Sequence, residues 1–138
     1  MQDTSIFNSA VAHYPGLKAQ FAKATATFEK RFAESAHLPE TSFKVAADGT
    51  RASLRAWGQD FDLSFRMVLR SDRKVGEFRV AMPATTHKPE TLLFSLHFDD
   101  AGNVRYSDDA RPIHLMGDHN SVSKVLEELT NTYFAHVA

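Results

Sequence analysis

Histidine and carboxylate residues near the end of the chain are the first candidates for chemistry. The sequence holds seven His, and the densest group is "HLMGDH", which contains His114, Asp118 and His119. Imidazole and carboxylate groups ligate divalent metals. The spacing matches no familiar closed site, however, and Asp118 also suits a helix start, where the helix dipole favours negative charge. We therefore expect no metal and no other cofactor, and we keep these three residues as the metal candidates to check.

Paired aspartates and short catalytic motifs give no positive support for an enzyme. The pairs in "FDDAGN" and "YSDDA" can do acid–base work in principle, but they lie in turn contexts, where Asp hydrogen-bonds its own backbone. No nucleophile elbow, P-loop or dinucleotide-binding glycine pattern is present. The chain has no Cys, which excludes disulfides, thiolate zinc sites and cysteine nucleophiles. We favour a non-enzymatic protein.

Arginines alternate with apolar residues in the stretch "DLSFRMVLR", residues 62–70. Leu63, Phe65, Met67 and Leu69 fall on one side, and Asp62, Ser64, Arg66, Val68 and Arg70 fall on the other. A period of two predicts a strand with one buried and one polar face. Guanidinium groups bind carboxylates and phosphates through paired hydrogen bonds, so the polar face is a candidate binding surface.

The elements that position these residues fit one domain spanning residues 1–138. We predict a short helix over roughly 4–13, a longer helix from Pro15 to about Ala36, strands over 42–107, and a final helix over 120–137. The stripe of the longer helix is Leu17, Phe21, Ala24, Phe28, Phe32 and Ser35, spaced along one helical face. No secretory leader pattern and no membrane-spanning apolar run is present, so we expect a cytoplasmic protein that does not enter membranes.

Three turns set the predicted strand pairing. Asp48-Gly49 is a strong two-residue hairpin turn, which pairs Phe43 with Leu54. A turn at Gly58-Gln59 pairs Leu54 with Leu63, and a turn over 71–74 pairs Arg70 with Val75. Each pairing brings apolar sets onto one common face, whereas a one-residue slip would invert a whole strand.

The resulting fold class is α+β. We expect a two-layer domain in the order α–β–β–β–β–β–β–α, with a mainly antiparallel sheet of about six strands. The N-terminal and C-terminal helices pack on its apolar face. The other face is then open to water or to a partner.

The predicted registers place Arg51 opposite Arg66, and Arg66 opposite Arg79, in one row across three strands. The other members of the predicted binding face are Arg55, Trp57, Arg70, His97 and Arg105. Lys44, Val68 and Leu93 share it. An alternative interpretation is a solvated salt network, in which Asp62 opposite Arg55 and Glu77 diagonal to Arg66 neutralise the row.

Three functions remain open from the sequence. The leading hypothesis is a small accessory, inhibitor or immunity-like protein whose open basic face recognises an acidic protein surface, or a second copy in a homodimer. Nucleic acid is an alternative partner for the same face, although the net charge of −1 suits it less well. A small-ligand protein or enzyme, with a pocket between helices and sheet, is the third.

Overall fold

The computed structural model describes residues 2–34, 40–70, 73–105, 114–115 and 118–137, without the side chains of 2–6, 114–115 and 119–121. Its elements are α1 (Gln2–Glu34), β1 (Ser42–Val45), β2 (Arg51–Ala56), β3 (Gln59–Arg70), β4 (Arg73–Met82), β5 (Thr91–Phe98), β6 (Asn103–Arg105), β7 (His114–Leu115) and α2 (His119–Val137). The predicted stripe residue Ser35 lies outside the described residues. Neither helix of the described chain combines the length and apolarity needed to cross a bilayer.

The N-terminal region is one continuous helix, so the prediction of two helices separated at Pro15 was wrong. Proline removes one helical hydrogen bond and commonly bends or ends a helix. Here tertiary contacts lie on both sides of it. The ring of Tyr14 packs 5.6 Å from that of Phe65, and His13 Nδ1 lies 3.2 Å from Asp100 Oδ2. These contacts, with Leu17 buried one turn later, hold α1 in line through the proline.

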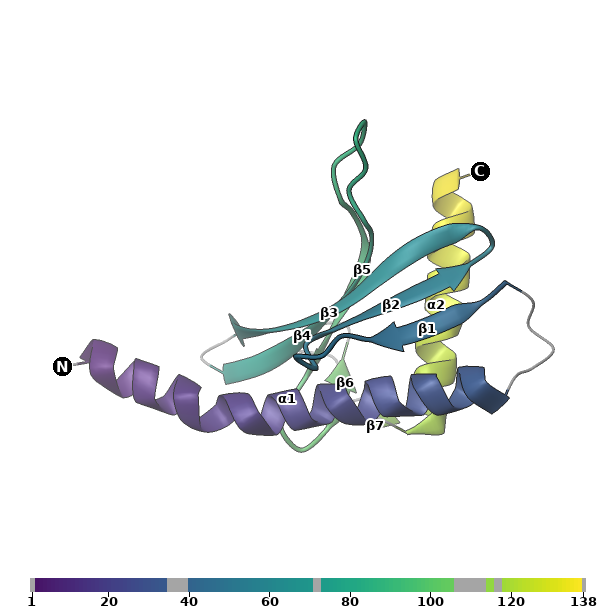
Figure 1. Cartoon of the computed structure of the whole chain (residues 1–138). Helices are drawn as coiled ribbons and strands as arrows, with labels where there is room; N and C mark the ends of the chain where they lie inside the picture. The colour runs from purple at the N-terminus through teal and green to yellow at the C-terminus, as the bar shows by residue number, and fades with distance from the viewer. Residues whose placement is uncertain (1, 35–39, 71–72, 106–113, 116–117, 138) are drawn as a thin grey trace.

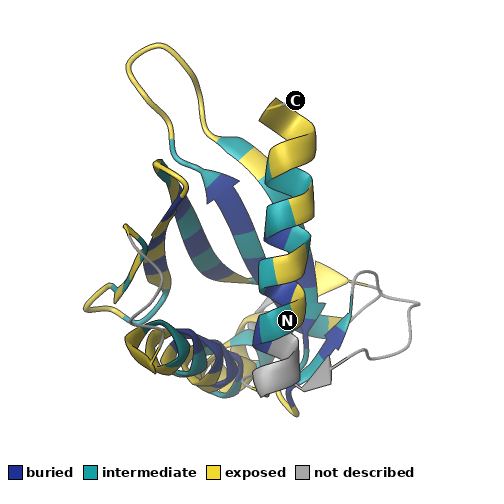
Figure 2. Ribbon diagram, turned by 90° about the vertical axis from the view of Figure 1, so that its right-hand side faces the viewer, coloured by how far each residue is buried: buried dark blue, intermediate teal, exposed yellow. Residues whose placement is uncertain are grey.

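Both helices cover the same face of the sheet, which confirms the predicted α+β architecture. The core joins α1 residues such as Phe21 and Phe28 to α2 residues such as Val125 and Leu129, over the apolar side of the strands. In Figure 2 the buried positions of the sheet lie in the part of it that the two helices flank. Arg31 Nη1 donates a hydrogen bond to Ser123 Oγ at 2.7 Å, which links the helices directly.

The described strands form a seven-stranded antiparallel sheet in simple sequence order, and it curls behind α1 (Figure 1). The prediction of about six strands is extended by β7, a two-residue edge strand. The first hairpin has the predicted register, with Phe43 opposite Leu54 and Val45 opposite Ala52. Asp48 Oδ1 accepts the Thr50 N–H at 3.0 Å inside this turn, which also holds the pKa of Asp48 below its usual value.

The next two registers differ from the prediction by two residues each. The β2–β3 turn consists of Trp57 and Gly58, both with positive φ, and it places Leu54 opposite Phe61. Positive φ at both central residues is the pattern of a type I′ hairpin turn. The β3–β4 hairpin pairs Arg70 with Arg73, so Phe65 lies opposite Phe78. A shift of two keeps every side chain on its predicted face, because the strand period is two.

Strand β5 contains one change of face. Val80 pairs with Phe94 but Ala81 pairs with Leu92, so the ladder skips Leu93 at a bulge. Leu93 packs against the core, and the side chain of Leu92 is exposed. The predicted placement of Leu93 on the outer face was therefore wrong, since an inserted residue inverts the alternation on one side of a bulge.

Candidate functional site

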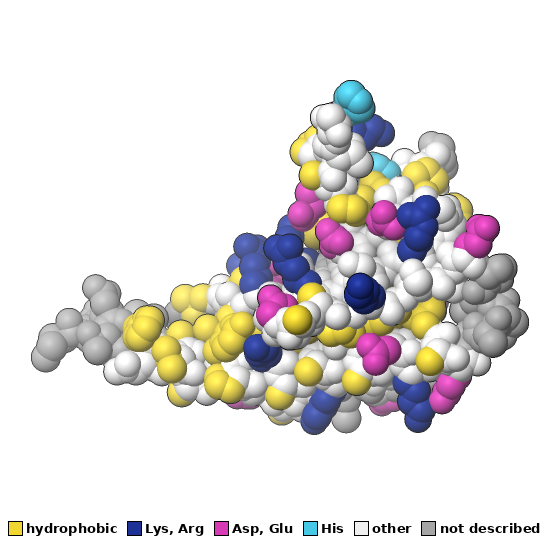
Figure 3. All heavy atoms as spheres, viewed as in Figure 1, with side chains coloured by type: hydrophobic (Ala, Val, Ile, Leu, Met, Phe, Trp, Pro, Cys, Tyr) yellow, Lys and Arg dark blue, Asp and Glu magenta, His cyan; other side chains and the backbone are white. Residues whose placement is uncertain are grey.

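The outer face of the sheet, away from both helices, carries most of the predicted arginines. Figure 3 shows Lys and Arg side chains interspersed with Asp and Glu over the sheet. The predicted row does not form, because Arg51 and Arg79 both pair with Ser64, and Arg66 pairs with Glu77. The like-charged neighbours expected from the sequence are thus replaced by one serine and one glutamate. This correction follows directly from the two-residue register shifts.

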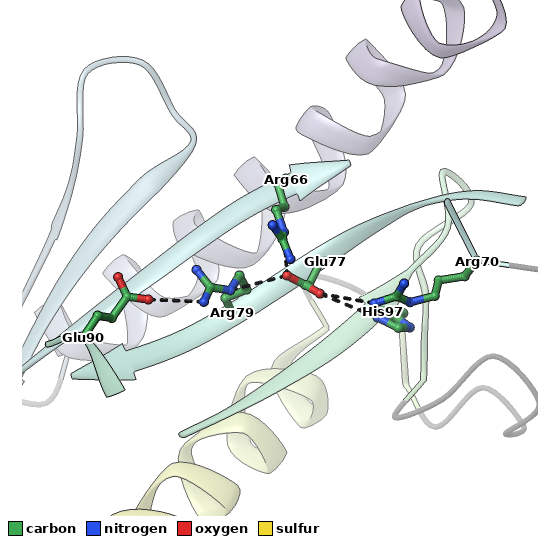
Figure 4. Close-up of polar contacts among 6 residues, drawn as sticks. All are labelled: Arg66, Arg70, Glu77, Arg79, Glu90 and His97. Carbon is green, nitrogen blue, oxygen red and sulfur yellow. Dashed lines mark hydrogen bonds and ion pairs between the residues drawn. The ribbon is translucent and has the colours of Figure 1, made fainter. Parts of the chain in front are cut away.

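Glu77 is the centre of the site, although the sequence analysis assigned it only a neutralising role diagonal to Arg66. Its side chain is 6% exposed and comes from the middle of β4. Arg66 Nε donates to Glu77 Oε1 at 2.8 Å, and Arg79 Nε lies 3.4 Å from the same oxygen. On the other carboxylate oxygen, Arg70 Nη2 and His97 Nε2 each lie at 3.9 Å (Figure 4). One buried carboxylate therefore draws together basic side chains from β3, β4 and β5.

The basic groups around Glu77 differ in exposure, which matters for what they can bind. The Arg66 side chain is 62% exposed and that of Arg70 is 43% exposed, whereas Arg79 is 27% exposed. Arg66 meets the carboxylate through Nε, and its terminal nitrogens make no hydrogen bond among the described residues. The Nε side of the Arg66 guanidinium is thus fixed by Glu77, and its two terminal nitrogens point away from that ion pair.

A polar hollow adjoins this cluster toward β2. Its lining includes two arginines, two serines and two acids: Arg51, Ser53, Asp62, Ser64, Arg79 and Glu90. Arg79 Nη2 lies 3.2 Å from Glu90 Oε1, so Arg79 bridges the hollow and Glu77. Burial raises the pKa of Asp62, and the nearby Arg51 only partly offsets this effect. The sequence prediction missed Glu90, because it belongs to the segment between β4 and β5 and follows no strand alternation.

At the strand ends, the predicted members of the face have separate roles. Arg55 Nη1 forms a 2.7 Å ion pair with Asp60 Oδ1, not with Asp62 as expected, and both side chains are more than half exposed. His97 lies opposite both Glu77 and Arg105. The Nε atom of Arg105 is buried and has no hydrogen-bond partner within the described chain.

Trp57 does not share the face with the arginines. It lies at the β2–β3 turn with φ of 54°, and its ring stacks on Tyr133 of α2 at 5.5 Å and 10°. It also contacts Phe61 and Phe134, so it closes the helix-covered side of the sheet. The prediction that it joins the arginine face is corrected. A tryptophan with left-handed backbone is rare, and sequence alternation alone does not indicate it.

Two of the three metal candidates have side chains outside the described part of the chain. The side chains of His114 and His119 are not described, and Asp118 is exposed just before α2, where its carbonyl accepts the Val122 N–H at 3.1 Å. Among the described residues, no group of three or more potential metal-ligating side chains is present. The paired aspartates of "FDDAGN" lie in a turn, in which Asp99 Oδ1 accepts the backbone N–H groups of Ala101 and Asn103.

Comparison with protein-family models, curated proteins and solved structures finds no significant match for this chain. Its function must therefore be argued from its own residues.

Proposed function

We propose that the chain is a small non-enzymatic binding protein whose outer sheet face recognises an acidic protein surface. The carrying observation is Glu77, one buried carboxylate beneath several basic side chains, of which Arg66 and Arg70 remain substantially exposed. Fixing a guanidinium before binding reduces the side-chain entropy that binding must offset. The face is thus preorganised for carboxylates, which guanidinium groups bind in a bidentate manner.

Charge supports the same proposal. The strand alternation places eight Lys and Arg on the outer face: Lys44, Arg51, Arg55, Arg66, Arg70, Arg73, Arg79 and Arg105. Four acids accompany them: Asp60, Asp62, Glu77 and Glu90. The whole chain carries −1, so this face is positive and the remainder of the molecule is negative. Such asymmetry orients and accelerates encounter with an acidic surface.

Nucleic acid is the less favoured partner for this face. Single-stranded platforms stack bases on aromatic side chains. Trp57 lies against α2, and the described outer-face positions of β1 to β6 carry no Phe, Tyr or Trp.

The test compares two labelled probes, a glutamate-rich peptide and a single-stranded RNA of equal length, by fluorescence anisotropy at increasing salt. We expect the peptide to bind more tightly than the RNA, and its affinity to fall with salt. Arg66→Glu with Arg70→Glu should weaken peptide binding by roughly tenfold or more. The matched control is Lys23→Glu with Lys30→Glu, which makes the same charge change on exposed positions of α1.

Three results would count against the proposal: no peptide binding at low salt, equal loss in both double variants, or tighter binding of the RNA. Sedimentation of the same samples tests the self-association alternative. A dimer that dissociates in the Arg66, Arg70 variant would assign the face to a second copy.

A second candidate function, binding of a small apolar ligand, has one observation in its favour. A hollow between the two helices and the sheet has an almost wholly apolar lining: Phe32, Leu54, Ala56, Trp57, Leu126 and Leu129, with Thr41 and Thr130. Ligand sites are typically concave and apolar with few polar groups. Nile red fluorescence tests it, because Thr130→Phe should fill the hollow and abolish dye binding while the exposed neighbour Asn131→Phe should not. Dye binding that survives Thr130→Phe would reject the hollow as the site.

A further inference from the structure

The apolar stripe of α1 continues beyond the part of the helix that the sheet covers. Leu17, Phe21 and Phe28 are buried. Three more apolar residues precede them at the same three- and four-residue spacing. They are Phe7, Val11 and Tyr14, which are 65%, 56% and 36% exposed. Figure 1 shows this end of α1 projecting past the sheet, and Figure 3 shows hydrophobic side chains along it. We refer to residues 2–16 as the overhang.

The overhang is poorly supported within one copy of the chain. An isolated helix of this length is marginal in water. Pro15 and Gly16 sit where the overhang joins the covered part of α1, and both weaken helix propagation. The His13–Asp100 pair and the Tyr14–Phe65 contact anchor it, and both lie at its base. A helical segment with so few contacts and an exposed apolar stripe would be stabilised by a partner that buries the stripe.

Charge indicates what kind of partner fits. The only ionisable side chains from residue 2 to residue 17 are Asp3, His13 and Tyr14, and there is no Lys or Arg. Helices that lie on anionic membranes carry Lys and Arg on their polar face. A charged protein partner would likewise need complementary charges. An uncharged apolar stripe is complementary to itself, and a two-fold axis places the same stripe on both sides of an interface.

The β3–β4 hairpin adds an exposed apolar side chain on the side of the sheet that α1 covers. Leu69 is 56% exposed and lies on the same face of β3 as Phe65, which contacts Tyr14. At these exposures, the four side chains offer roughly half of the ~800 Å² per partner of a standard interface.

We propose that the overhang, through Phe7, Val11 and Tyr14 with Leu69, is a homodimer interface in which two copies cross antiparallel near Val11. This surface is separate from the basic outer face, so the two binding functions can operate together. The modest area implies a reversible dimer, which dissociates on dilution.

The test is sedimentation velocity on the full chain over a hundredfold range of concentration, with two adjacent substitutions. Val11→Glu places a charge in the stripe, and Ala12→Glu places the same charge about 100° further around the helix, on an exposed residue outside the stripe. We expect a concentration-dependent dimer for the wild type and for Ala12→Glu, and a monomer for Val11→Glu. Far-UV circular dichroism at low concentration checks that the variants remain folded.

Cross-linking gives a second measurement that does not depend on a charged substitution. The chain has no cysteine, so Val11→Cys and Ala12→Cys each introduce a single thiol. Under mild oxidation, Val11→Cys should form the covalent dimer and Ala12→Cys should remain largely monomeric. A wild type that is monomeric throughout, a dimer unaffected by Val11→Glu, or equal cross-linking at both positions would overturn the proposal.

Discussion

Replacing Glu77 by Gln tests whether the buried carboxylate organises the outer face. The change keeps the size of the side chain but removes the charge at a position that is 6% exposed. Hydrogen bonds to charged groups contribute about 1.5–3 kcal/mol and neutral ones about 0.5–1.5 kcal/mol, so each close contact loses about 1 kcal/mol. The contacts from Arg66 at 2.8 Å and Arg79 at 3.4 Å are the two close ones. Repulsion between the arginines adds up to ~1 kcal/mol.

We therefore expect Glu77→Gln to lower the free energy of unfolding by about 2–3 kcal/mol. Removing one exposed partner should have a smaller effect. Arg66→Gln leaves Glu77 paired with Arg79, and Arg66 is 62% exposed, so its loss should be about 0.5–1 kcal/mol. Both variants remove the Arg66–Glu77 ion pair. The structure predicts that Glu77→Gln nevertheless lowers the free energy of unfolding more than Arg66→Gln does.

Urea unfolding followed by the fluorescence of Trp57, the single tryptophan, measures both variants. Its stacking on Tyr133 makes it sensitive to the separation of sheet and helix. Glu29→Gln, an exposed change on α1, is the control and should stay within about 0.5 kcal/mol of wild type. Equal destabilisation by Glu77→Gln and Arg66→Gln, or a Glu77→Gln variant as stable as the control, would refute the central role of Glu77.

Substitutions at three further positions test other parts of the structure. Burial raises the pKa of Asp62 above 3.8, so the stability that Asp62 contributes is present below that pH and is lost as the pH rises through the raised value. Asp62→Asn should therefore be more stable than wild type at neutral pH. The urea unfolding midpoints of the two proteins should converge on acidification. Gly76→Ala would drive a methyl group into the buried ring of Phe98, and thermal unfolding should report a loss of about 1–3 kcal/mol or more. Trp57→Ala and Trp57→Gly both lose the Tyr133 stack, but glycine accepts the φ of 54°, so calorimetry should find the glycine variant more stable by about 1 kcal/mol.

Much of the fold could be predicted because its periodicities are strict. The three- and four-residue spacing of Leu17, Phe21 and Phe28 marks the buried side of α1, and these residues are in the core. The first hairpin keeps its predicted register although its turn is longer than the predicted two residues. The Ala46 N–H donates to Arg51 O at 2.9 Å, and Gly49 but not Asp48 has positive φ, so the longer loop is centred on the same two residues. The continuity of α1 through Pro15 could not be predicted, since it depends on contacts with β3 and with Asp100, distant in sequence.

The site was less predictable than the fold for a geometric reason. A hairpin register that is wrong by two residues leaves each side chain on its correct face, so apolar alternation does not reveal the error. It does replace every cross-strand neighbour, and a binding site is defined by its neighbours. The expected Arg66–Arg79 pair thereby became the observed Arg66–Glu77 pair.

Cross-strand charge is the property that distinguishes such registers. Like charges directly opposite are unfavourable, and opposite charges are favourable, by a few tenths to ~1 kcal/mol. The predicted registers set Arg51 and Arg79 each against Arg66, whereas the observed ones set Arg66 against Glu77 and leave Arg51 and Arg79 opposite Ser64. The like-charged pair that remains, Arg70 with Arg73, lies at the exposed end of its hairpin, where repulsion is best screened. Where hydrophobic alternation allows two registers, the one that pairs opposite charges in the middle of the sheet is favoured, and here it also assembles the basic cluster around Glu77.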